Sequence, residues 1–216
     1  MKVFLHFFCV LSLLVSCSPK SGFELQEGDI LFQDIDCGIY CESIESVTRG
    51  YQGANLSHCG IVTIKDNKAF VLEAISKGVS LTPLDSFLNR SFDENNQPKV
   101  FVGRVSGLQM ATESVLIAEK KMGKPYDSKY DITDDTYYCS ELVYYSFLRN
   151  GEPIFKLNPM TFKALNTDST FAAWEGYFAD LNVPIPEGEP GLNPGGISLS
   201  KEIEVVHFYG KPSGMQ

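Results

Sequence analysis

The segment at residues 138–148, with the sequence YCSELVYYSFL, constrains the fold more than any other part of the chain. Its apolar side chains point to nearly every side of a helix, and Asn150-Gly151 is a typical helix end. A helix that is apolar on all sides has to be enclosed by other elements. The sequence therefore predicts a helix buried in the interior of the domain.

The sequence predicts five strands of a sheet. Each of these short segments either follows a turn or is rich in β-branched and aromatic residues. We interpret the second, third and fourth as an antiparallel meander, because turn-forming residues such as Asp66-Asn67 separate them. A helix at residues 108–122 carries one apolar stripe, with which it would pack on the sheet. The expected fold class is α+β, with helices packed against an antiparallel sheet. The five segments are residues 28–32, 58–65, 69–74, 100–105 and 203–209.

Three shorter helices are also expected. Residues 41–49 have helical apolar spacing, and Thr82-Pro83 is typical of a capped helix start that leads to about residue 89. Asn158-Pro159 predicts a further helix to about residue 165. The Pro- and Gly-rich residues 184–196 are expected to form an ordered loop over one face, rather than a linker between domains.

Composition excludes one class of partner. The 216 residues carry a formal net charge of −9, whereas nucleic-acid-binding proteins need a basic surface to displace phosphate counterions. The length suits one domain with its own hydrophobic core.

The first residues indicate export. Residues 1–16 combine a basic start with an apolar run that is too short to span a bilayer, as in a signal peptide. The run ends in Leu-Val-Ser-Cys17, which resembles the lipobox of bacterial lipoproteins, and this predicts lipidation of Cys17. An ordinary secretory signal is the alternative. Residues 17–22 would form the lipidated tether and residues 23–216 the domain, in the cell envelope on the periplasmic or cell-surface side. Ser18 favours the outer over the inner membrane.

Four cysteines remain in the expected domain, in a compartment where disulfides can form. Cys37 and Cys41 are the most favourable pair, if any forms. They could instead join His58 and Cys59 in a metal cluster, but their spacing matches no zinc pattern with a second two-ligand knuckle. We therefore expect neither a metal nor another cofactor.

Three residues have the chemistry of a nucleophilic site. Cys139 stands at the first turn of the buried helix, where the helix dipole stabilises a thiolate. His58 begins one predicted strand, and Glu73 lies inside the next among apolar residues, where a carboxylate needs a partner such as His58 or a lysine. Adjacent antiparallel strands would let Glu73 orient His58 while His58 faces Cys139. Each residue alone is also compatible with a structural role.

Five motifs in this order resemble the YiiX/YaeF group of circularly permuted papain-like enzymes of the NlpC superfamily. The resemblance covers residues 28–148 and implies Cys139 as the nucleophile, His58 as the general base and Glu73 as the residue that orients His58. It implies amidase, peptidase or acyl-transfer chemistry through a thioester. Cys59 departs from this pattern, because a disulfide from Cys59 to Cys41 or Cys139 would alter or abolish reactivity. The motifs are GDILF, LSHCGIV, VLEA, YD and YCSELV.

An oxyanion hole would use the backbone N–H of Cys139, with Tyr138 or Tyr126 as a second donor. The expected substrate is a cell-wall peptide or a lipid-derived amide or ester, and the N-terminal lipid would hold the protein at the membrane. Two alternatives remain open. One is a binding module that captures a small peptide, amino acid or lipid on the same scaffold. The other is a metal-dependent or redox protein that uses Cys37, Cys41 and Cys59.

Overall fold

The computed structural model describes residues 22–164 and 167–216. The predicted signal peptide, Cys17 and all of the tether except Gly22 lie outside the described residues. Within the described ranges, no helix has both the length and the apolar character needed to cross a membrane.

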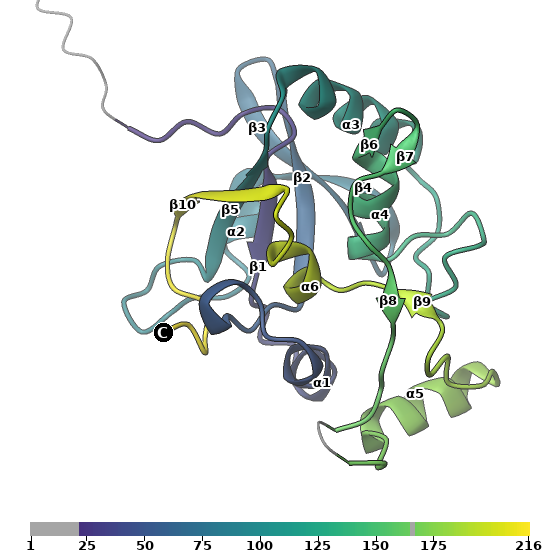
Figure 1. Ribbon diagram of the computed structural model, residues 1–216. Helices are drawn as coiled ribbons and strands as arrows, with labels where there is room; N and C mark the ends of the chain where they lie inside the picture. Colours follow the sequence, from purple (N-terminus) through teal and green to yellow (C-terminus); the bar gives the residue numbers. More distant parts are fainter. Residues whose placement is uncertain (1–21, 165–166) are drawn as a thin grey trace, which may run out of the picture.

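The centre of the molecule is a six-stranded sheet in the order β10-β5-β1-β2-β3-β4 (Figure 1). Every neighbouring pair runs antiparallel. All five predicted strands are present, and the expected α+β class with an antiparallel sheet is confirmed. The strands are β1 (Ile30–Gln33), β2 (His58–Lys65), β3 (Lys68–Ile75), β4 (Gly78–Pro83), β5 (Val100–Val105) and β10 (Ile203–Phe208).

The order of the strands differs from the expected meander. β2 and β3 form the predicted hairpin, with Asp66 and Asn67 both at positive φ, but the strand next to β3 is β4. The short turn before Gly78, whose φ is +96°, allows β4 to fold back directly on β3. β5 lies between β1 and β10 instead. Pairing over that sequence distance leaves no local pattern that could have predicted it.

One face of the sheet is covered by α3 (Leu108–Lys120) and α4 (Cys139–Ser146) (Figure 1). Leu142 and Val143 of α4 share the main core with residues of the sheet such as Phe32 and Ile61. Every α4 side chain is buried except those of Tyr144 and Tyr145, which are half-buried, so the predicted burial of this helix is confirmed.

The opposite face carries a smaller core around Val62, Val71 and Val102, to which α2 (Leu84–Leu88) contributes Phe87. The predicted cap of α2 is wrong, since the cap position is Pro83 and no side chain caps the helix. The Thr82 hydroxyl instead donates a hydrogen bond to Glu73 on the adjacent strand. A buried carboxylate competes better for this hydroxyl than the exposed helix end does.

The remaining elements lie outside the sheet. A disulfide joins Cys37 and Cys41 at the start of α1 (Ile39–Val47), the pair that the sequence favoured. The expected helix end at Asn150-Gly151 is wrong, because α4 ends at Ser146 and these two residues, at positive φ, form the turn between two short strands. Further elements are η1 (Tyr51–Gly53), β6 (Leu148–Arg149), β7 (Glu152–Pro153), β8 (Asn158–Pro159), α5 (Ala172–Leu181), β9 (Pro190–Gly191) and α6 (Pro194–Ser198). The two short strands β6 and β7 lie beside α3 and α4, and α5 lies beside α1 (Figure 1).

The helix predicted from Asn158 to about residue 165 is wrong as far as the structure describes it. Asn158–Pro159 forms β8, which pairs with β9, and the Met160 N–H donates to the Glu189 carbonyl. Phe162 then packs against Trp174 and Phe178 of α5. Burial of this aromatic cluster outweighs the local helix signal. The predicted ordered loop at residues 184–196 is confirmed, with β9 and the first residues of α6 inside it.

Candidate active site

Cys139 is the first residue of α4 and is 9% exposed. Tyr138 before it has an extended backbone, and the Tyr138 N–H donates a 3.2 Å hydrogen bond to Oε2 of Glu141. The helix therefore begins directly at the cysteine, where unpaired N–H groups and the helix dipole favour a thiolate.

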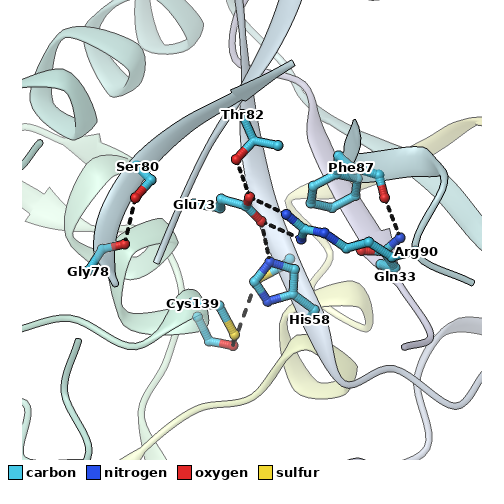
Figure 2. A network of polar contacts seen from close by, with 11 residues as sticks. Gln33, His58, Glu73, Gly78, Ser80, Thr82, Phe87, Arg90 and Cys139 are labelled. Carbon is cyan, nitrogen blue, oxygen red and sulfur yellow. Dashed lines mark hydrogen bonds and ion pairs between the residues drawn. The ribbon is translucent and has the colours of Figure 1, made fainter. Parts of the chain in front are cut away.

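His58 is the first residue of β2, and Glu73 lies near the end of β3. The register pairs Ile61 with Leu72, which makes Glu73 a diagonal neighbour of His58 on one face of the hairpin. Nε2 of His58 is 2.6 Å from Oε2 of Glu73. Figure 2 shows the imidazole between the Glu73 carboxylate and the Cys139 side chain, so that Nδ1 is the ring nitrogen left for Cys139.

Glu73 is held by two further side chains that sequence reasoning did not assign to the site. Arg90 forms two hydrogen bonds to the carboxylate, and Thr82 forms one of 2.5 Å to Oε1 (Figure 2). The sequence signal was the buried carboxylate itself, for which His58 or a lysine was the expected partner. An arginine beyond the next strand and helix could not be selected from that signal.

The charges of these groups support one another. Burial alone would lower the pKa of His58, but hydrogen bonds with Cys139 and Glu73 outweigh burial and raise it to about 9. Burial would raise the pKa of Glu73, whereas hydrogen bonds from Arg90, His58 and Thr82 lower it to about 2. The pKa of Cys139 is well below its ordinary value because contacts with Cys59 and His58 outweigh burial. At neutral pH the arrangement favours a thiolate, an imidazolium and a carboxylate.

Cys59 is a free thiol next to Ser140 and Cys139. Its Sγ is 3.8 Å from the Ser140 hydroxyl, and Sγ of Cys139 is the same distance from that hydroxyl. Cys59 and Cys139 are both free, so the structure contains neither of the disulfides that would block the site. Burial, and after it the neighbouring Cys139, raises the pKa of Cys59 well above that of an ordinary thiol, which leaves Cys139 as the thiolate.

The two tyrosines that the sequence singled out have different surroundings. The Tyr138 hydroxyl accepts a 3.3 Å hydrogen bond from the Leu192 N–H and so anchors the segment after β9. The pKa of Tyr126 is raised by burial and, next, by the charge of Cys139. Both rings line the same pocket as Cys139. Tyr126 and Tyr138 therefore both lie where a hydroxyl could donate to a group bound at Cys139, and Tyr138 in addition holds Leu192.

A pocket of about 640 Å³ opens at His58 and Cys139. Its walls come from α1 and from the chain between β7 and α6, and they include Ile44, Val47, Ile154, Phe162, Trp174 and Leu192. This volume is typical of a site for a small molecule or one chain of a larger ligand. The described residues bring together no group of three or more His, Cys, Asp or Glu side chains that could hold a metal ion. Cys37 and Cys41, which the metal-cluster alternative would use, are instead joined in a disulfide.

Comparisons with protein families, with curated proteins and with solved structures agree with one another. Residues 24–207 match a family model described as permuted papain-like amidase enzymes, YaeF/YiiX, C92 family. The uncharacterized protein YiiX of Escherichia coli K12 is 33% identical over 138 residues, which span 62% of this chain and 63% of YiiX. A crystal structure described as metalloprotein yiiX from Escherichia coli O157:H7 covers 88% of this chain and 100% of its own, with a TM-score of 0.72 and 24% identity. The structural match establishes the fold.

Proposed function

The chain belongs to the family of permuted papain-like amidases, and from this premise we propose that Cys139, His58 and Glu73 form its catalytic triad. The observation that carries the proposal is the 2.6 Å contact between His58 and Glu73, with Cys139 on the other side of the same imidazole. A nucleophile, a base and a group that orients the base are the side chains that acyl transfer through a covalent intermediate uses.

In the first half of the reaction, the Cys139 thiolate attacks the carbonyl carbon of an amide or ester. The developing oxyanion accepts hydrogen bonds from the Cys139 N–H and the Tyr126 hydroxyl. His58 then passes its Nδ1 proton to the leaving amine or alkoxide as the bond to that group breaks. The product is a thioester on Cys139 and a neutral imidazole that Glu73 still orients.

In the second half, neutral His58 takes a proton from water, and the resulting hydroxide adds to the thioester carbonyl. Collapse of this second tetrahedral intermediate releases the carboxylic acid and restores the thiolate and the imidazolium. An amine or alcohol in place of water would give transfer instead of hydrolysis. The solved relative is described as a metalloprotein, but the described residues of this chain bring together no group of three or more metal-binding side chains, and no step here uses a metal.

The proposed substrate is an amide or ester of the bacterial cell envelope. The largely apolar walls of the pocket favour a lipid-derived acyl group over the charged stem peptide of the cell wall. Purified domain should therefore release amine from an N-acyl amide, and Cys139→Ser should abolish this release. Faster cleavage of a stem peptide under the same conditions would reverse the choice of substrate. Binding of either compound without turnover would favour the binding-module alternative.

We further propose that the protein is a lipoprotein of the cell envelope, attached through Cys17. The support is the signal-like run at residues 1–16 and the lipobox-like residues that end it. Two acyl signals hold a protein firmly at a membrane, whereas one chain does so only marginally. Full-length protein should fractionate with membranes, and Cys17→Ser should leave an unprocessed precursor without lipid label. Cleavage of the Cys17→Ser precursor at the normal rate would indicate an ordinary secretory signal.

A further inference from the structure

Arg90 and the Glu73 carboxylate form a two-pronged contact (Figure 2). Nη1 of Arg90 is 2.7 Å from Oε2, and Nη2 is 2.5 Å from Oε1. The carboxylate is fully buried, whereas the Arg90 side chain is 24% exposed. The guanidinium thus reaches in from the surface to a carboxylate that solvent cannot reach.

The element that supplies Arg90 also contacts His58. Arg90 follows α2, and its Cζ lies 5.0 Å from the centre of the Phe87 ring of that helix. The Phe87 ring is in turn 5.7 Å from the His58 ring. Stacking on Phe87 limits the positions that the guanidinium can adopt. α2 therefore positions Phe87 against the His58 ring, and it also positions Arg90 as the counter-ion of Glu73.

The hydrogen bonds to Glu73 use its full capacity as an acceptor. Oε2 accepts from His58 and Arg90, and Oε1 accepts from Thr82 and Arg90. An ionised carboxylate has about four such acceptor positions. A carboxylate bound at all four cannot rotate away from the imidazole, and its charge is balanced by the guanidinium.

We propose that Arg90 is a positioning residue for the reaction, which fixes Glu73 in orientation and keeps it ionised, so that the proton of the Cys139–His58 pair stays on His58. This inference rests on the proposed triad. Without Arg90, burial would make Glu73 take up a proton at higher pH, and a neutral Glu73 would no longer stabilise the imidazolium. The thiolate would then be lost at a higher pH than in the unmodified protein.

The test measures the alkylation rate of Cys139 by iodoacetamide against pH, read by peptide mass, in Arg90→Gln and Arg90→Lys. Arg90→Gln should move the acidic limb upward by at least one pH unit, which means a rate about tenfold lower on that limb. Arg90→Lys keeps the positive charge but loses the two-pronged contact, and its acidic limb should therefore move upward less than that of Arg90→Gln. An acidic limb unchanged in Arg90→Gln would overturn the proposal.

Arg104 provides a matched control. It makes the same kind of two-pronged contact with a fully buried carboxylate, at 2.7 and 2.8 Å from Asp29, and its side chain is 26% exposed. Arg104→Gln should lower stability about as much as Arg90→Gln and leave the alkylation profile unchanged. An equal shift in both variants would mean a general loss of structure and would also overturn the proposal.

Two outcomes separate this inference from the triad itself. If Arg90→Gln fails to fold, the alkylation profile of Arg90→Lys decides alone. A profile of Arg90→Lys equal to that of the unmodified protein at every pH would show that the two-pronged contact has no role. If the unmodified protein has an ordinary thiol that His58→Ala does not change, the proposed function fails before Arg90 is considered.

Discussion

Oε2 of Glu73 lies 2.6 Å from Nε2 of His58, and both side chains are buried. The two side chains leave the same face of the β2–β3 hairpin, and Gly60 occupies the position between them on β2. A Cβ on Gly60 would lie 2.5 Å from a methyl group of Val71 and 3.3 Å from Cβ of Glu73. The hairpin thus leaves the space that the contact requires.

Glu73→Gln should lower turnover by about 10²- to 10⁴-fold, because the amide cannot stabilise the imidazolium. The same change leaves Arg90 without its anion, and we expect a loss of about 2 kcal/mol in the free energy of unfolding, measured with urea. The double variant Glu73→Gln/Arg90→Gln removes the unpaired charge and should recover part of this stability without recovering activity. Activity that returned together with stability would argue for a purely structural role of Glu73.

Turnover and alkylation should differ in their dependence on basic pH. Hydrogen bonds with Cys139 and Glu73 raise the pKa of His58 to about 9, so the proton needed by the leaving group is lost above that pH. The value of kcat/KM should therefore fall above about pH 9, whereas alkylation, which needs only the thiolate, should not. A kcat/KM that stayed level above about pH 9 would contradict the role of the His58 proton, and parallel decreases in both rates would indicate that the folded site is lost at basic pH.

Glu141→Gln should make stability less dependent on pH. Burial raises the pKa of Glu141 from 4.5 to about 9, so the folded chain holds a proton there that the unfolded chain releases above pH 4.5. The contribution of Glu141 to stability is therefore highest below pH 4.5 and decreases as pH rises toward 9, by up to about 1.4 kcal/mol per unit. Urea unfolding at pH 5 and pH 8 should show a smaller difference in Glu141→Gln. An unchanged difference would mean that Glu141 is ionised in the folded protein.

Tyr126→Phe should lower kcat about 100- to 1000-fold if its hydroxyl donates to the oxyanion. Tyr138→Phe is the matched control, because it removes a hydroxyl from the same pocket that instead accepts the Leu192 N–H. We expect Tyr138→Phe to raise KM through the segment after β9 and to change kcat less. Equal losses of kcat in the two variants would contradict a specific role of Tyr126 as the oxyanion donor.

The parts of the site that the sequence predicted are those that depend on local patterns. The apolar run at residues 138–148 set the start of α4 at Cys139, and the Asp66-Asn67 turn set the hairpin that brings Glu73 to His58. Each signal extends over fewer than about twenty residues, so sequence spacing alone could carry it.

The parts that could not be predicted depend on contacts between distant segments. β5 pairs with β1 and β10 because the sheet is completed by strands far apart in sequence. The segment after Asn158 pairs with β9 and packs its aromatic side chains on α5, against its local helix signal. Arg90 reaches Glu73 only because α2 folds back over the sheet. Tertiary packing decided each of these outcomes.

The most direct test of the central claim is the alkylation rate of Cys139 against pH in the unmodified domain and in His58→Ala. The account predicts a thiolate that titrates well below the ordinary value of about 8.5, and a shift of this titration upward when the imidazole is removed. Peptide mass analysis keeps the Cys139 signal separate from that of buried Cys59. A thiol that titrates normally and reacts at the same rate in both proteins would contradict the triad and favour a binding module on this scaffold.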